Sequence, residues 1–140
     1  MSQKTLSQLR DADFAKSLKE SLRRYRAMSV RPTSTQIIED ALAARPQRFY
    51  LTYRTIEARI NRLRREAIGA GGKKLSASQQ QWVEVSAAIN RFLARNKRAT
   101  MSDAINHVVN FARPSRFFIS ERKAQQLFRL TLRREYHFVK

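Results

Sequence analysis

The chain of 140 residues contains no cysteine, only three glycines and three prolines, and 11 acidic residues. Without cysteine there is no disulfide, thiolate metal site or cysteine nucleophile, which fits a reducing cytoplasm. No apolar run approaches the roughly 20 residues of a transmembrane helix, and the N-terminus has no signal-peptide core. We therefore expect a cytoplasmic protein, or a phage virion component assembled in the cytoplasm, with no membrane-spanning segment.

Residues that usually carry catalysis are scarce and scattered. The two histidines, His107 and His137, belong to no ligand pattern, and the sequence has no zinc motif or nucleophile elbow. Gly71-Gly72-Lys73 resembles only a fragment of a phosphate-binding loop, because the first glycine and the hydroxyl residue after the lysine are missing. The sequence thus predicts a protein that is not an enzyme and that has no cofactor or metal.

Basic residues, in contrast, are abundant. Lysine and arginine number 29, so the formal net charge is +18, while the hydrophobic fraction of 42% is that of a chain with a core. This charge opposes compaction by self-repulsion unless a polyanion is close. Nucleic acid is the leading candidate, because neutralised phosphates release condensed counterions. An anionic membrane surface and an acidic protein are the alternatives.

One short segment occurs twice in nearly the same form, as ARPQRFYLT over residues 44–52 and ARPSRFFIS over residues 112–120. The second copy lies 68 residues after the first, and the match extends before and after it. Ile37 aligns with Ile105 and, further along, Arg65 aligns with Arg133. The shared order of turn, aromatic pair, cap and helix indicates a duplication.

Each repeat has the pattern of three helices. Apolar residues three and four apart predict long helices over Leu6 to Ala27 and Ser78 to Asn96. The second helix is expected to begin near Ser34 or Thr35 in the first repeat and at Ser102 in the second, and Thr52 and Ser120 are expected to cap the third helices. We therefore expect an all-α chain of about six helices, in two tandem related three-helix units over 1–68 and 76–140, joined by a glycine-rich linker at 69–75.

The third helix of each repeat is predicted to have an arginine face opposite its apolar face. The apolar sides include Ile56 and Ile60 in one helix and Ala124 and Phe128 in the other. The arginines on the opposite faces are Arg54, Arg62, Arg65, Arg122, Arg129 and Arg133. Acids are nearly absent from these faces, so we interpret them as polyanion contacts rather than ordinary solvated surfaces.

The doubled segment adds arginines beside the start of each third helix. Backbone N–H groups at that position already favour a phosphate, so arginines there would form a phosphate clamp. The candidates are Arg45, Arg48, Arg113 and Arg116. The aromatic residues Phe49 and Phe117 are expected to fill the gap between helices instead.

The pattern from Ser34 to Arg65, with its copy from Ser102 to Arg133, resembles the trihelical helix-turn-helix of small DNA-binding proteins from phages and mobile elements. This resemblance implies duplex DNA binding, with the third helix reading bases. The segment from Arg45 to Leu51 contains proline and is longer than the usual tight, glycine-containing turn. Insertion of the third helix into a groove is therefore left open.

Taken together, these patterns predict a non-enzymatic nucleic-acid-binding protein, with DNA favoured over RNA. Two other classes stay open: a virion or structural protein whose basic surface meets nucleic acid or an acidic partner, and an RNA- or ribosome-associated binder. A protein partner or self-association is also open. The expected signature of the leading hypothesis is a steep dependence of binding on salt.

Overall fold

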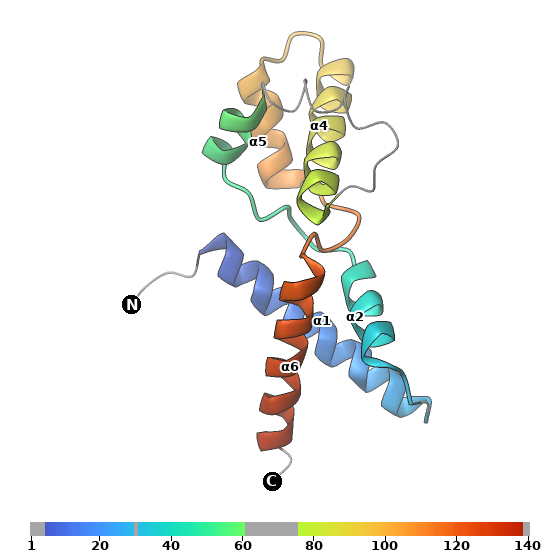
Figure 1. Cartoon of the computed structure of the whole chain (residues 1–140). Helices are drawn as coiled ribbons and strands as arrows, with labels where there is room; N and C mark the ends of the chain where they lie inside the picture. The colour runs from blue at the N-terminus through green and yellow to red at the C-terminus, as the bar shows by residue number, and fades with distance from the viewer. Residues whose placement is uncertain (1–4, 30, 61–75, 139–140) are drawn as a thin grey trace. The chain divides into compact units, whose positions relative to one another are not determined.

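The computed structural model describes residues 5–29, 31–60 and 76–138 (Figure 1). Within these ranges the chain forms six helices and no strand, which confirms the all-α class. The helices are α1 (Leu6–Ala27), α2 (Ser34–Ala43), a helix over residues 53–60, α4 (Ala77–Arg95), α5 (Met101–Phe111) and α6 (Glu121–Phe138). The long helix predicted from Leu6 to Ala27 is confirmed at both ends.

Polar side chains fix the starts of the helices. Thr5, Thr33, Ser76 and Thr100 each close a capping box with the residue three positions later. The two predicted caps of the third helices are confirmed: Thr52 Oγ1 accepts from the N–H of Thr55 at 3.2 Å, and Ser120 Oγ accepts from the N–H of Lys123 at 3.2 Å. Local sequence therefore sets where each helix begins.

The described helices belong to two compact units that differ from the predicted boundaries of 1–68 and 76–140. Unit 1 comprises residues 1–45 and 115–140, and so contains α1, α2 and α6. Unit 2 comprises residues 46–114 and contains α4, α5 and the helix over 53–60. The predicted linker at 69–75 lies outside the described residues.

This division exchanges the third helices of the two sequence repeats. In unit 1, α6 from the second repeat packs on α1 and α2 from the first. In unit 2, the helix over 53–60 from the first repeat accompanies α4 and α5 from the second. The chain leaves unit 1 after Arg45 and returns to it at Ser115. Both copies of the doubled nonapeptide are therefore the segments in which the chain crosses between units.

The core of unit 1 joins the two repeats directly. Phe14 and Leu18 of α1 are fully buried, and the Phe117 ring meets the Phe14 ring edge-on with 5.5 Å between their centroids. The backbone N–H of Phe117 donates to the carbonyl of Leu42 at the end of α2 at 2.9 Å. The Phe117 side chain thus fills the gap between helices, as predicted, and holds the start of the α6 segment against α1 and α2.

The core of unit 2 forms around Trp82 of α4, which is 5% exposed. The Arg59 guanidinium lies over the Trp82 ring, 5.1 Å from its centroid. At the start of the same helix, the Tyr53 hydroxyl donates to Ser102 Oγ of α5 at 3.0 Å. Phe49 is buried, as predicted, and its carbonyl accepts from the Gln81 side chain at 3.0 Å. These contacts attach the helix over 53–60 to α4 and α5.

One residue departs from the helical periodicity of the core. In the sequence, the apolar spacing of Ile105, Val108 and Phe111 predicts that all three face inward, but the Phe111 side chain is 74% exposed. The periodicity identifies the correct side of α5, because Ala104, two turns earlier on the same side, is fully buried. Phe111 is the last residue of α5. Periodicity shows which side of a helix is buried, but it does not show how far along the helix the neighbouring helices cover that side.

Candidate nucleic-acid interface

Both units carry the same large positive charge. Unit 1 has 16 lysines and arginines against 7 acids, and unit 2 has 13 against 4, so each has a formal net charge of +9. In unit 1, Asp11 pairs with Arg10 and Lys123, and Asp40 pairs with Arg24. These pairs use few of the cations, and the excess is distributed over both units.

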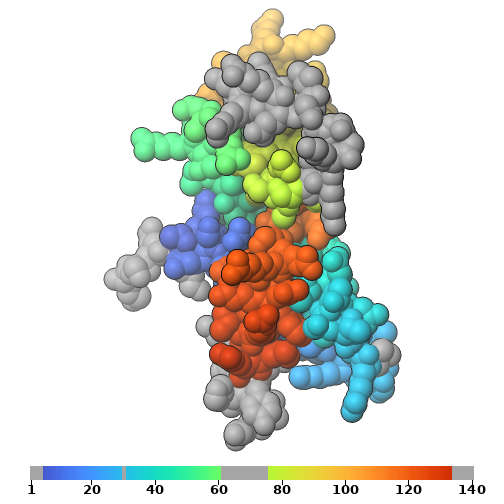
Figure 2. Space-filling view, viewed as in Figure 1, coloured from blue at the N-terminus to red at the C-terminus, as the bar shows by residue number. Residues whose placement is uncertain are grey.

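The arginine face predicted for the last helix lies on the open side of α6. Arg122, Arg129 and Arg133 are exposed, and among the residues that the structure describes no hydrogen bond or ion pair involves them. The opposite side of α6 carries the buried residues Ala124, Leu127, Phe128 and Thr131. Figure 2 shows α6 as an uncovered surface of unit 1, beside α2. A row of free guanidinium groups therefore follows this helix.

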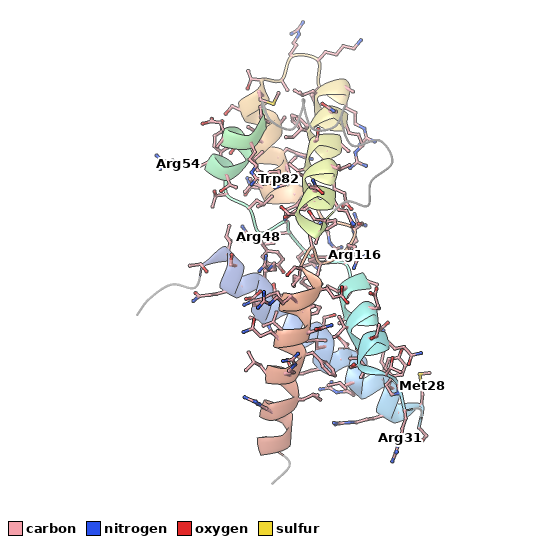
Figure 3. The ribbon with its side chains drawn as sticks, in the orientation of Figure 1. Met28, Arg31, Arg48, Arg54, Trp82 and Arg116 are labelled. Atoms are coloured by element: carbon pink, nitrogen blue, oxygen red, sulfur yellow. The ribbon has the colours of Figure 1, made fainter. Side chains whose placement is uncertain are left out.

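The matching face in the first repeat is described only at its start. Arg54 is exposed, makes no ion pair within the described ranges, and points away from the helix over 53–60 (Figure 3). Ile56, two residues later, is 1% exposed. Arg62 and Arg65 lie outside the described residues. The predicted opposition of arginine and apolar residues thus holds for Arg54 and Ile56.

Two of the four arginines predicted to clamp phosphate have contacts inside the protein. Arg113 Nε donates to the carbonyl of Pro46 at 3.0 Å, which ties the two ends of unit 2 together. Arg45 also has an interaction within the chain. The Arg113 side chain is therefore engaged within the protein, and neither arginine is without a contact in the chain.

The other two arginines predicted to clamp phosphate, Arg48 and Arg116, are half-buried. Arg48 Nε is buried and has no hydrogen-bond partner among the described residues. A buried donor without an acceptor is costly, and an anionic oxygen is the strongest acceptor for a guanidinium N–H. Arg116 makes no hydrogen bond or ion pair within the described part of the chain. Figure 3 labels both residues, one in each crossing segment.

Side chains suited to other chemistry are not gathered in one place. Within residues 5–29, 31–60 and 76–138, no three histidine or acidic side chains lie together as metal ligands would. None of the helices in these ranges combines the length and apolar character needed to cross a membrane. Asp40 Oδ2 accepts a hydrogen bond of 2.7 Å from the fully buried Ser21 hydroxyl, and this bond links α1 to α2.

Two features of unit 2 escape a reading of the sequence alone. The Arg59 guanidinium makes a cation–π contact with the Trp82 ring and does not belong to the exposed arginine face. His107 stacks on Phe92 and also lies beside Phe111, forming a row of three rings. The spacing of four between His107 and Phe111 is visible in the sequence. The stacking of Phe92 on His107 depends on how α4 packs against α5, which the sequence alone does not show.

Comparison of the chain with models of protein families, with curated proteins and with solved structures finds no match in any of the three.

Proposed function

We propose that this chain is a non-enzymatic nucleic-acid-binding protein whose preferred ligand is double-stranded DNA. The observation that carries the proposal is the free arginine row of α6, formed by Arg122, Arg129 and Arg133. Guanidinium groups bind phosphate oxygens through paired, charge-assisted hydrogen bonds. The buried side of the same helix keeps this row turned toward solvent.

The dimensions of the row suit a duplex. Eleven residues separate Arg122 from Arg133, which is about 16 Å at 1.5 Å per residue. Over that length a DNA duplex presents about ten phosphate charges. All three arginines can therefore reach phosphates of one duplex segment without bending it.

The repeated sequence suggests a second phosphate contact, made by Arg54 of unit 2. Arg54 occupies the place in the first repeat that Arg122 occupies in the second. Each unit carries +9, so two related units in one chain would bind two adjacent stretches of backbone. Arg48 and Arg116 would add phosphate contacts at the crossing segments, where the unpartnered Nε of Arg48 favours an anionic acceptor.

The mode of binding follows from the exchange of helices. α2 belongs to unit 1 and the helix over 53–60 belongs to unit 2, so the pattern from Ser34 to Arg65 spans two units. We propose that phosphate contacts supply most of the affinity. Any reading of base edges would come from the third helices, in the manner implied by the helix-turn-helix resemblance.

The test compares two variants that lose the same charge. One carries Arg122→Gln, Arg129→Gln and Arg133→Gln on α6. The matched control carries Lys16→Gln, Arg23→Gln and Arg31→Gln, three exposed cations of unit 1 that make no ion pair in its described part. Binding to a labelled 30-base-pair duplex is followed by fluorescence anisotropy at 100 mM salt, and helicity by circular dichroism.

At this salt concentration, each lost phosphate contact weakens binding about eightfold, so three contacts together account for up to about 500-fold. We expect the α6 variant to lose at least eightfold and the control to stay within about threefold of wild type. Equal losses in both variants would show that net charge alone matters. Tighter binding to structured RNA than to duplex DNA would assign the protein to RNA. Equal affinity for every duplex sequence would indicate nucleic-acid packing rather than site recognition.

A further inference from the structure

Two glutamines lie between the arginines of the α6 row and share their exposed face. Gln125 and Gln126 follow Arg122 by three and four residues. Arg129 follows the two glutamines by four and three residues, so these side chains are neighbours on the helix surface. Both glutamines are exposed, and among the residues that the structure describes no hydrogen bond involves either side chain. Each amide therefore offers a carbonyl oxygen and an NH₂ group beside the guanidinium groups.

The third helix of the first repeat shares the leading arginine of this face but not the two glutamines. Arg54 aligns with Arg122. Glu57 and Ala58 stand at the two glutamine positions, and both are exposed, so packing against the core does not explain the difference. A phosphate contact is the same at every base pair, whereas a base contact depends on the residue that makes it. This comparison favours arginines that bind the backbone and intervening residues that meet the bases.

The exposed face of α6 has the size and the chemistry to read a major groove. An α-helix is about 10–12 Å across and the major groove of B-DNA is about 12 Å wide, so a helix fits into it. Figure 2 shows α6 uncovered on unit 1. A glutamine amide pairs with adenine through two hydrogen bonds, because it accepts from the N6 amino group and donates to N7. Arginine side chains are longer, so they can reach phosphates at the rim of the groove while the glutamines meet base edges.

An exposed leucine beside the glutamines matches the same kind of base pair. Leu130 is 42% exposed and follows Gln126 by four residues, so the two side chains are neighbours. In the major groove an A·T pair presents N6 and N7 of adenine together with the methyl group of thymine, which takes apolar contacts. Leu132, the other exposed leucine of α6, lies about 200° further around the helix. An amide with an apolar neighbour therefore matches A·T pairs better than G·C pairs.

We propose that Gln125 and Gln126 are the specificity-determining residues of α6 and that they read adenine in the major groove of duplex DNA. This inference rests on the proposed duplex binding and adds to it the base pairs that are preferred. Leu130 contacts the thymine methyl group of a neighbouring A·T pair. Glu57 and Ala58 cannot make the amide contact with adenine, so unit 2 does not share this preference.

The test uses the full-length protein and a pool of 30-base-pair duplexes with a randomised centre. Bound duplexes are selected at 100 mM salt and sequenced for wild type, for the double variant Gln125→Ala with Gln126→Ala, and for Gln47→Ala. Gln47→Ala is the matched control, because Gln47 is an exposed glutamine of unit 2 with no hydrogen bond among the described residues. These changes keep the net charge, and alanine favours the helix at exposed positions, so the double variant should stay folded. Circular dichroism reports its helicity.

We expect wild type and Gln47→Ala to enrich the same neighbouring A·T pairs, and the double variant to enrich none of them. On a selected duplex, exchanging one of these pairs for G·C should weaken wild-type binding by about 5- to 150-fold and binding of the double variant by less than about twofold. Replacing the adenine with 7-deazaadenine removes the N7 acceptor but keeps base pairing and phosphates. It should weaken wild-type binding and leave the double variant unchanged.

Several results would overturn the reading of adenine. Wild-type binding with a steep salt dependence but no selected sequence overturns it and leaves the proposed function standing. An A·T preference that survives in the double variant also overturns it, because other residues then select the sequence. Wild-type binding that is insensitive to 7-deazaadenine assigns the preference to the shape of the groove instead and has the same consequence. A wild-type chain that binds no duplex overturns both proposals.

Discussion

The exchange of third helices predicts an energetic coupling between residues that the tandem arrangement would place in different units. Phe14 lies in the first repeat and Phe117 in the second, yet their rings meet edge-on at 5.5 Å in unit 1. Both are buried, at 0% and 5% exposure. Aromatic pairs of this kind contribute about 0.5–1.5 kcal/mol beyond the area that they bury.

A double-mutant cycle measures this coupling. Phe14→Leu and Phe117→Leu keep apolar volume in the core, so each single variant should remain folded. The free energy of unfolding is obtained from urea titrations followed by circular dichroism for wild type, both single variants and the double variant. We expect the double variant to be more stable than the sum of the single losses predicts, by about 0.5–1.5 kcal/mol.

The control cycle pairs Phe117→Leu with Trp82→Phe. Trp82 is the counterpart of Phe14 in the second repeat and belongs to unit 2. Since Phe117 belongs to unit 1, these two changes should add to within about 0.5 kcal/mol. Coupling of Phe117 to Trp82, together with additivity between Phe117 and Phe14, would refute the exchange and restore the boundaries at 1–68 and 76–140.

Three further outcomes follow. Asp40→Ala should cost about 1–3 kcal/mol of unfolding free energy, because the buried Ser21 hydroxyl loses its 2.7 Å acceptor; an unchanged urea midpoint would contradict this. Thr100→Ala should cost about 1 kcal/mol in the same assay by removing the cap of α5, and no loss would count against that capping box. A chain of residues 46–114 alone should fold, because that segment is one compact unit; a spectrum of an unfolded chain would contradict the division.

Most of the helices are predictable from sequence because their causes are local. Thr52 and Ser120 are N-caps whatever their helices pack against. The outward direction of Arg129 and Arg133 follows from the apolar residues on the other side of α6. Helix periodicity therefore identified the exposed arginines on the described part of the third helices.

The pairing of helices is not predictable in the same way. Both repeats place a small or branched apolar residue at the same point of the third helix, Ile56 in one and Ala124 in the other, and both are buried. Either helix therefore has an apolar side suited to either pair of first and second helices. The choice is made by contacts distant in sequence, such as Phe117 with Leu42 and Arg113 with Pro46. Because Arg113 donates to the Pro46 carbonyl, it is not one of the free arginines that could clamp a phosphate.

The dependence of duplex affinity on salt tests the proposed function most directly. Four described arginines, Arg54, Arg122, Arg129 and Arg133, are exposed and free of ion pairs within that part of the chain. If each contacts one phosphate, the logarithm of the association constant falls against the logarithm of salt concentration with a slope of about −3.6 or steeper. Affinity then drops by about 150-fold or more between 50 and 200 mM salt.

The same titration with Arg122→Gln, Arg129→Gln and Arg133→Gln should give a slope shallower by about 2.7. A wild-type slope near zero, or the same slope with and without these three arginines, would contradict the assignment of the α6 face to phosphate binding.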